Sequence, residues 1–183
     1  MSRNALILHG TGARPEWLWY SWLGSRLRER GYDVVVPHHP GINVDPLADV
    51  LPQVLAHRFD EETVLVGHSG GAALLLAVLE RLEVAVAQSV LVAGYSTPPN
   101  DGTEPALQTT YDWPAIRRSA GDLWFVNSVT DPYGCDAEQG RAMQRRLRGT
   151  LVVRDDPAPG AGTQLDPRHF EADTLELVDR LIP

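Results

Sequence analysis

The sequence predicts a doubly wound α/β fold with a mostly parallel six-stranded sheet, for three reasons. Six short runs rich in valine, isoleucine and leucine recur along the 183 residues. These runs are continuously apolar rather than alternating, as expected for parallel strands that are buried on both faces. Helical patterns lie between the runs throughout, and this alternation of strand and helix is typical of a sheet built with right-handed crossovers.

The apolar runs define the expected strands, and the helices are placed by their start and stop signals. Residues 16–30 place apolar side chains four apart, carry arginines near the end and stop at Gly31. Asp45 as the capping residue followed by Pro46 is typical of a helix start, and Pro52 is expected to kink or restart that helix. The expected strands are residues 5–9, 33–37, 63–67, 89–93, 123–127 and 150–154, and further helices are expected at 70–83, 136–147 and 170–182.

Length, charge and cysteine content bound the class of protein. A chain of 183 residues with 43% hydrophobic residues can bury one core, so we expect a single domain over residues 1–183. The net charge of −8 argues against nucleic acid and against anionic membranes as partners. The lone Cys135 fits a reducing compartment, and the apolar run near the N-terminus is too short for a signal peptide. We therefore expect a soluble, cytoplasmic protein.

The segment GHSGG at residues 67–71 is the strongest functional signal in the chain. It follows an expected strand and precedes an expected helix, which is the context of the nucleophile-elbow motif Gly-x-Ser-x-Gly. A serine in so sharp a turn is strained, and the glycines on either side remove side chains that would obstruct it. Ser69 is therefore the candidate nucleophile. The alternative is a turn of small residues that only packs helix on sheet.

A serine nucleophile needs a histidine to accept its proton and a carboxylate to orient that histidine. In this kind of fold the partners follow in the order serine, acid, histidine, on loops at the carboxyl ends of strands. Asp131 lies in the loop after the fifth strand, and His169 is the only histidine after it. The alternatives are that Asp131 is a turn residue before proline, that His169 caps a surface helix, or that a rival acid at 155 or 156 serves.

The loop after the first strand should supply part of the oxyanion hole. We expect the backbone amides of Thr11 and Gly70 to bind the oxyanion, with Gly10 and Gly12 letting the backbone approach the substrate. His9 belongs to the same loop and is assigned to substrate binding with these two glycines.

Two further side chains are assigned to the substrate site. Trp17 opens an aromatic stretch and could form an apolar wall beside the serine, whereas the alternative is that these aromatics pack beneath the helix. His68 occupies the variable position of the elbow and is expected to line the site. No histidine or cysteine spacing resembles a metal site, and no cofactor is expected.

These residues resemble a known family. The segment from His9 to Gly12 with its tryptophan-rich continuation, GHSGG, the Thr130-Asp131-Pro132 turn and His169 resemble the small serine hydrolases related to retinoblastoma-binding protein 9 and the bacterial YdeN-like proteins. The resemblance covers nearly the whole chain. It implies a compact α/β-hydrolase without a cap domain, with a sheet in the order 2-1-3-4-5-6.

For activity, the resemblance implies a Ser69–His169–Asp131 triad that hydrolyses small ester or amide bonds. Thioesters are a further candidate class of substrate. The chain departs from the family in having Gly70-Gly71 where serine-glycine is frequent and in a long histidine loop over residues 160–168. Both departures bear on substrate preference and not on the class of reaction.

Other functions are weighed against this one. A dinucleotide-binding fingerprint after the first strand fails because its third glycine position is Pro15. A noncatalytic protein-binding module that retains the fold is the main alternative, although a scaffold needs no strained serine. Cys135 lacks an elbow and is expected to be a bystander thiol. The expected partner is a small acyl substrate. The oligomeric state, monomer or weak homodimer, stays open, as do a protein partner and the role of the long loop 94–112.

Overall fold

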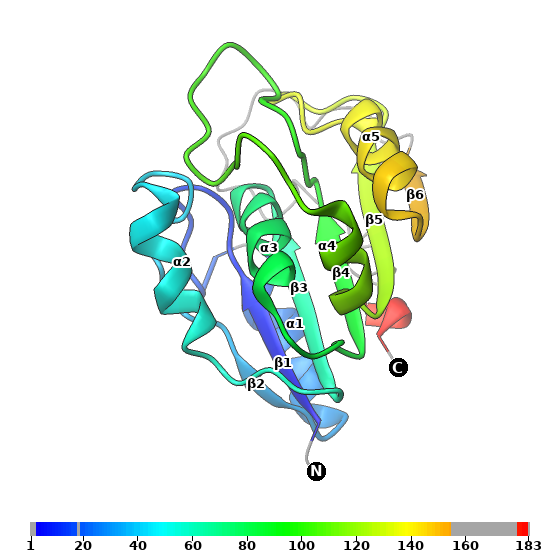
Figure 1. Cartoon of the computed structure of the whole chain (residues 1–183). Coiled ribbons are helices and arrows are strands. Elements are labelled where there is room, and N and C mark those ends of the chain that lie inside the picture. The colour runs from blue at the N-terminus through cyan, green and yellow to red at the C-terminus, as the bar shows by residue number, and fades with distance from the viewer. Residues whose placement is uncertain (1–2, 18, 155–178, 183) are drawn as a thin grey trace.

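A single six-stranded parallel sheet organises the chain, in the order β2-β1-β3-β4-β5-β6 (Figure 1). The computed structural model describes residues 3–17, 19–154 and 179–182. The predicted fold class and strand order are confirmed. The strands are β1 Asn4–Leu8, β2 Asp33–Val35, β3 Thr63–His68, β4 Gln88–Val92, β5 Asp122–Ser128 and β6 Thr150–Arg154.

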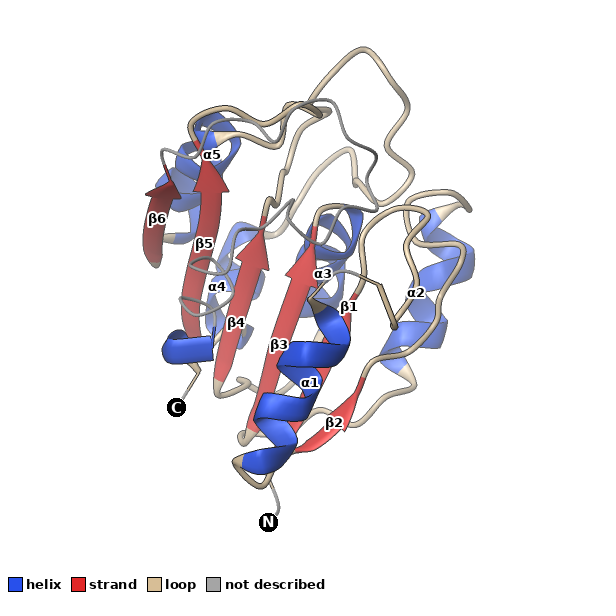
Figure 2. Cartoon of the chain, turned by 180° about the vertical axis from the view of Figure 1, so that it is seen from behind, coloured by secondary structure: helices blue, strands red, loops and turns tan. Residues whose placement is uncertain are grey.

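The helices form two layers on opposite faces of the sheet. They are α1 Tyr20–Glu29, α2 Leu47–Leu55, α3 Gly70–Arg81, α4 Trp113–Ser119 and α5 Ala137–Leu147. Figure 2, seen from behind, shows α1 in front of the sheet, while α2, α3, α4 and α5 lie on the far side. The C-terminal residues join α1, because Ile182 packs into the same apolar cluster as Leu23 and Leu27.

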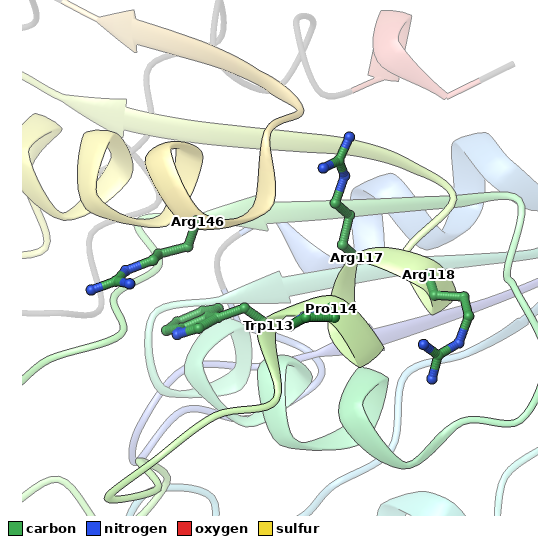
Figure 3. Close-up of a pocket in the computed structure, with 5 residues that line it drawn as sticks. All are labelled: Trp113, Pro114, Arg117, Arg118 and Arg146. Atoms are coloured by element: carbon green, nitrogen blue, oxygen red, sulfur yellow. The ribbon is translucent and has the colours of Figure 1, made fainter.

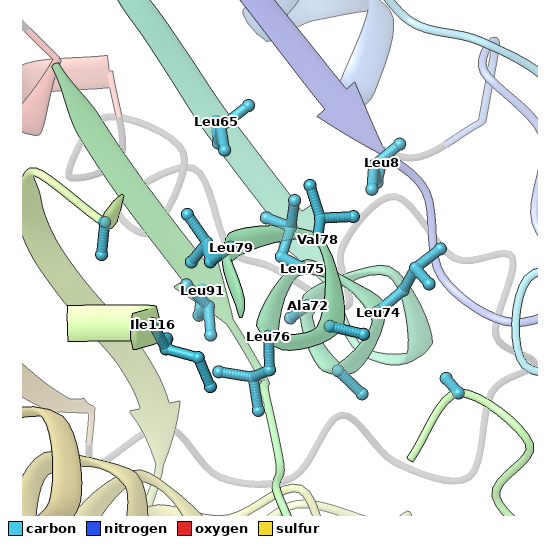
Figure 4. Close-up of a cluster of buried hydrophobic side chains, with 14 of the residues drawn as sticks. Leu8, Leu65, Ala72, Leu74, Leu75, Leu76, Val78, Leu79, Leu91 and Ile116 are labelled. Carbon is cyan, nitrogen blue, oxygen red and sulfur yellow. The ribbon is translucent and has the colours of Figure 1, made fainter. Parts of the chain in front are cut away.

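The central helix α3 supplies most of the larger core. All ten residues from Gly70 to Leu79 are buried, because α2 and α4 flank the helix and the sheet lies beneath it. Figure 4 shows its leucines around the helix, facing Leu65 and Leu91 of the sheet and Ile116 of α4. Burying one leucine stabilises a fold by about 1.5–3 kcal/mol. The elbow serine is thus attached to a helix whose first ten residues are all buried.

Two helix starts need correction, and Pro52 does not restart its helix. Helix α1 begins at Tyr20 rather than at residue 16, because the preceding residues form turns in which the Trp17 N–H donates to the Arg14 carbonyl at 3.0 Å. The N-cap of α2 is Pro46 itself, and its side chain makes no capping hydrogen bond, so Asp45 is not the cap. Pro52 lies inside α2 without dividing it into two helices.

One helix was not predicted, and another lies mostly outside the described part. Helix α4 begins where the Asp112 side chain accepts a hydrogen bond from the Ala115 N–H at 2.9 Å. The helix expected at 170–182 falls largely outside the described residues, although Asp179 forms an ion pair with Arg30 at 2.9 Å. Within the described residues, no helix has the length and apolar character needed to cross a membrane.

Candidate active site

Ser69 lies at the turn between β3 and α3 with a backbone that few serines adopt. Its φ of 51° and ψ of −119° place it in the left-handed half of conformational space, where a side chain costs about 1–3 kcal/mol. The surrounding bonds hold it there. Its N–H donates to the Val92 carbonyl at 2.9 Å, and its carbonyl accepts from the N–H groups of Ala72 and Ala73. The strain is therefore held by neighbouring elements and not by the turn alone.

The glycines of the motif are required by packing rather than by their own backbone angles. A Cβ at Gly67 would lie 2.7 Å from the Cα of Ala72. A Cβ at Gly71 would lie 2.4 Å from the His9 carbonyl oxygen. Because the atoms it would meet are backbone, the first turn of α3 can approach β1 and β3 this closely only without side chains at these positions.

The two predicted oxyanion donors lie together beside the serine. A Cβ at Gly70 would be 2.5 Å from the Thr11 Oγ1, so the loop after β1 lies directly against the first turn of α3. Neither the Thr11 N–H nor the Gly70 N–H donates to an acceptor in the described part of the chain. The positive end of the α3 dipole lies at the same place. Their assignment as the oxyanion hole stays a prediction.

His9 is a buried support of this loop. Its side chain is fully buried, with Nδ1 2.8 Å from the Gly10 carbonyl and Nε2 accepting from the His39 N–H at 3.1 Å. These bonds require a neutral ring with the proton on Nδ1. Burial lowers the pKa of His9, which favours that neutral form. His9 therefore links the loop after β1 to the segment after β2 through its two hydrogen bonds.

His68 is also buried, beneath the loop. The Tyr20 hydroxyl accepts from the Gly10 N–H at 3.0 Å and lies 2.5 Å from the His68 Nδ1. Tyr20 and His68 therefore share a buried hydrogen bond, and the tautomer of the ring sets its direction. Trp19 packs edge-on against the same ring. Burial raises the pKa of Tyr20, so its hydroxyl stays neutral.

Trp17 is half-buried, and the guanidinium of Arg14 lies 5.8 Å from its ring centroid. Gly12 has a φ of 67°, which only glycine adopts freely. Neither residue contributes to the described lining of the pocket beside Ser69, and the same is true of His9, Gly10 and His68. Their assignment to substrate binding stays a prediction.

The predicted acid is held in place by its own loop. Asp131 Oδ1 accepts from the backbone N–H groups of Tyr133 at 2.8 Å and Cys135 at 3.1 Å. Its Oδ2 has no hydrogen-bond partner among the described residues and is the atom that could accept a hydrogen bond from a histidine N–H. His169 falls outside the described residues, as do the rival acids at 155 and 156, so the triad stays a prediction.

A pocket of about 130 Å³ opens beside the serine. One wall is Cys135, whose thiol is buried close to Ser69. Burial raises the pKa of this thiol and the carboxylates of Asp131 and Glu104 raise it further, so it is a neutral neighbour and a poor nucleophile. The pocket is lined by Thr11, Asn43, Ser69, Tyr95, Pro99, Asn100, Glu104, Tyr133 and Cys135.

Fold and site geometry together can be compared with known proteins. A profile of the alpha/beta hydrolase family matches residues 5–181 of the chain. The chain belongs to the α/β-hydrolase family. The predicted resemblance is thereby confirmed. Within the family, YdeN of Bacillus subtilis (strain 168) is 29% identical over 137 residues, which cover 72% of each protein.

Solved structures of other proteins have the same architecture as this α/β-hydrolase. The crystal structure of the ydeN gene product from B. subtilis superposes with a TM-score of 0.73 at 25% identity, covering 85% of this chain and 86% of that one. Est1E from Butyrivibrio proteoclasticus with bound ferulic acid superposes with a TM-score of 0.66 at 16% identity. This match covers 98% of this chain and 86% of Est1E. SOBER1 from Arabidopsis thaliana superposes with a TM-score of 0.62 at 14% identity, and this match covers 98% of this chain and 97% of SOBER1. The last two bear on the fold alone.

Asn43 is a site residue of this α/β-hydrolase that sequence reasoning missed. Its Nδ2 donates to Thr11 Oγ1 at 3.1 Å and to Glu104 Oε2 at 2.6 Å, and its Oδ1 accepts from the Ala106 N–H at 3.0 Å. The Asn43 side chain thus joins the loop after β1 to the 94–112 loop. Its φ of 56° is tolerated best by asparagine and glycine, but no local pattern announces the role.

Asn127 was also missed, although a signal was present. It is a polar residue near the end of an apolar strand, and its side chain is buried. Its Nδ2 donates to the carbonyls of Gly94 at 3.1 Å and Cys135 at 2.9 Å. It therefore fixes the loop that carries Asp131 relative to the loop after β4.

A second, larger hollow of about 400 Å³ lies between α4 and α5. It is lined by Trp113, Pro114, Arg117, Arg118 and Arg146, whose guanidinium groups point in different directions in Figure 3. Charges that diverge do not form an anion site, and none of these residues is part of the elbow. In the part of the chain that the structure describes, no group of three or more His, Cys, Asp or Glu side chains could hold a metal.

Proposed function

We propose that this α/β-hydrolase is a serine hydrolase that cleaves small ester, thioester or amide bonds through an acyl-enzyme on Ser69. The observation that carries the proposal is the strained serine, which sits in a pocket beside two backbone N–H groups with no described acceptor. Backbone strain persists where the surrounding structure holds the residue in place, and strained residues cluster at functional sites. A scaffold that only bound proteins would gain nothing from this strain, which argues against the noncatalytic alternative.

In the first half of the proposed reaction, the Ser69 oxygen attacks the substrate carbonyl carbon while its proton moves to His169. The carbonyl oxygen becomes an oxyanion, which the Thr11 and Gly70 N–H groups bind more strongly than the ground-state carbonyl. When the tetrahedral intermediate collapses, the bond to the leaving group breaks. His169 returns its proton to the departing alcohol, thiol or amine, and the acyl group stays on Ser69.

In the second half, water replaces the leaving group. His169 takes a proton from the water as its oxygen attacks the acyl carbon, and a second oxyanion forms at the same donors. Collapse releases the carboxylic acid and returns the proton to Ser69. Asp131, held by its two backbone donors, accepts a hydrogen bond from the other ring N–H of His169 and stabilises the imidazolium between these steps. No cofactor is required.

Covalent labelling tests the nucleophile directly. A fluorophosphonate probe should label the wild-type protein, and short para-nitrophenyl esters should be turned over. Ser69→Ala should abolish both, since it removes the reacting oxygen. Ser25→Ala, on the exposed face of α1, is the matched control and should behave as wild type. Labelling of Ser69→Ala at the wild-type level would refute the proposal.

A further inference from the structure

Among the described residues that line the pocket beside Ser69, Glu104 carries the one carboxylate. Glu104 comes from the 94–112 loop and lines the pocket together with the serine. Its Oε2 accepts from the Tyr95 hydroxyl at 2.5 Å and from Asn43 Nδ2 at 2.6 Å. These two donors hold the carboxylate in place, while Oε1 has no hydrogen-bond partner within residues 3–17, 19–154 and 179–182. Glu104 therefore lines the pocket with a carboxylate that has one oxygen, Oε1, available to a ligand.

The remaining lining is unusual for a pocket that would hold a plain acyl chain. No described basic side chain lines it, whereas two tyrosines do, Tyr95 and Tyr133. Aromatic rings beside a carboxylate are the surroundings that attract ammonium groups, both primary and quaternary. Apolar side chains dominate most pockets that select for hydrocarbon chains, whereas Pro99 is the one aliphatic side chain in the described lining of this pocket.

A second observation indicates that the described carboxylates make a negative contribution to the field in the pocket. The thiol of Cys135 forms part of the wall, and both Asp131 and Glu104 raise its pKa. The two carboxylates therefore act on the same volume from different loops. A neutral substrate gains nothing from this field, and a substrate carboxylate would be repelled by it.

We propose that Glu104 forms a cation subsite, which selects substrates that carry a positively charged nitrogen close to the carbonyl attacked by Ser69. The proposal rests on the proposed hydrolase function for its catalytic consequence, but the subsite itself is a binding property. Asn43 and Tyr95 are positioning residues for the carboxylate. The subsite gives the 94–112 loop a role in specificity, because the loop carries both Tyr95 and Glu104.

Paired substrates of equal shape measure the effect of charge alone. In one pair the cation is in the acyl part: the trimethylammonioacetyl and tert-butylacetyl esters of para-nitrophenol. In the other pair it is in the alcohol part: acetylcholine and neohexyl acetate. For each pair, the ratio of kcat/KM for the cationic over the neutral ester is compared between wild type and Glu104→Gln. The intrinsic reactivity of each ester cancels in this comparison.

The ratio should fall by roughly 10- to 100-fold in Glu104→Gln for at least one pair, as expected when one charge-assisted contact is lost. Glutamine keeps an oxygen that can accept from Tyr95 and Asn43, so the loop should stay in place. Glu61→Gln is the matched control, because it removes one negative charge from an exposed position at the opposite end of β3. An unchanged ratio in both pairs, or an equal fall in the control, would overturn the subsite.

A measurement without turnover separates this proposal from the hydrolase function. Ser69→Ala protein is titrated calorimetrically with choline and with neohexanol, and choline should bind about 10-fold more tightly. The preference should vanish in the Ser69→Ala/Glu104→Gln double variant. If the preference vanishes as expected but the wild-type protein hydrolyses no ester, the subsite stands and the proposed function falls. If neutral esters are hydrolysed without any preference for charge, the function stands and the subsite falls.

Discussion

The substitution Gly71→Ala tests how closely the elbow depends on backbone packing. A Cβ at this position would lie 2.4 Å from the His9 carbonyl oxygen and 2.7 Å from that of Leu8. Ordinary contact begins at 3.4 Å, so the helix or the strand must move by 3.4 − 2.4 = 1.0 Å. Both neighbours are backbone atoms at the end of β1 and cannot rotate away as a side chain could.

The expected cost follows from two opposing effects. Overpacking a tight interior costs about 1–3 kcal/mol, and this contact is at the severe end of that range. Alanine has a better helix propensity than glycine by at most about 1 kcal/mol. The net loss should be about 2 kcal/mol, which for a domain of this size lowers Tm by roughly 4–8 °C. Because Ser69 lies in the same turn, the shift should also lower kcat/KM by about 100-fold.

Thermal melting and ester hydrolysis measure the two effects, and Gly24→Ala is the matched control. Gly24 also lies inside a helix, but a Cβ there would first meet the tip of the Arg28 side chain at 3.2 Å, which can move. That variant should keep full activity and gain about 0.5–1 kcal/mol. If Gly71→Ala melts at the wild-type temperature with unchanged kcat/KM, the argument from close packing is wrong.

Two further predictions concern groups outside the elbow. The rings of His39 and His57 approach to 3.3 Å between their Nε2 atoms, and burial lowers the pKa of each. The fold therefore favours the neutral forms, while the unfolded chain takes up protons near pH 6.5, so stability should fall as the pH drops below about 6.5. Urea unfolding at about pH 7.5 and pH 5.5 measures this loss, which His57→Gln should reduce; an equal loss in that variant would contradict the assignment. Asn127→Ala should lower both Tm and kcat/KM, because two buried carbonyls lose their donor at about 1–3 kcal/mol each. The exposed Gln53→Ala is its control, and a Tm equal to that control would show that Asn127 does not support the loops.

Local signals predicted the elements well where one physical rule acts alone. The strand at 150–154 was placed to the residue, since a short apolar run between glycine and polar residues has few other uses. The start of α1 was placed too early because the apolar spacing continues through residues that the structure folds into turns. Helix α4 was missed although Asp112 and Pro114 form a recognisable start signal, because the helix is short and follows a long loop.

The sequence by itself determined the α/β class and the candidate nucleophile, because both depend on patterns of neighbouring residues. Apolar runs must be buried, and a serine between glycines after a strand can occupy one kind of turn. Only the tertiary structure decided what surrounds that serine. Asn43 and Glu104 are 61 residues apart and meet through one hydrogen bond, which no local pattern encodes. Contacts of this kind depend on how loops at one edge of the sheet pack against each other, and that packing sets which substrate fits.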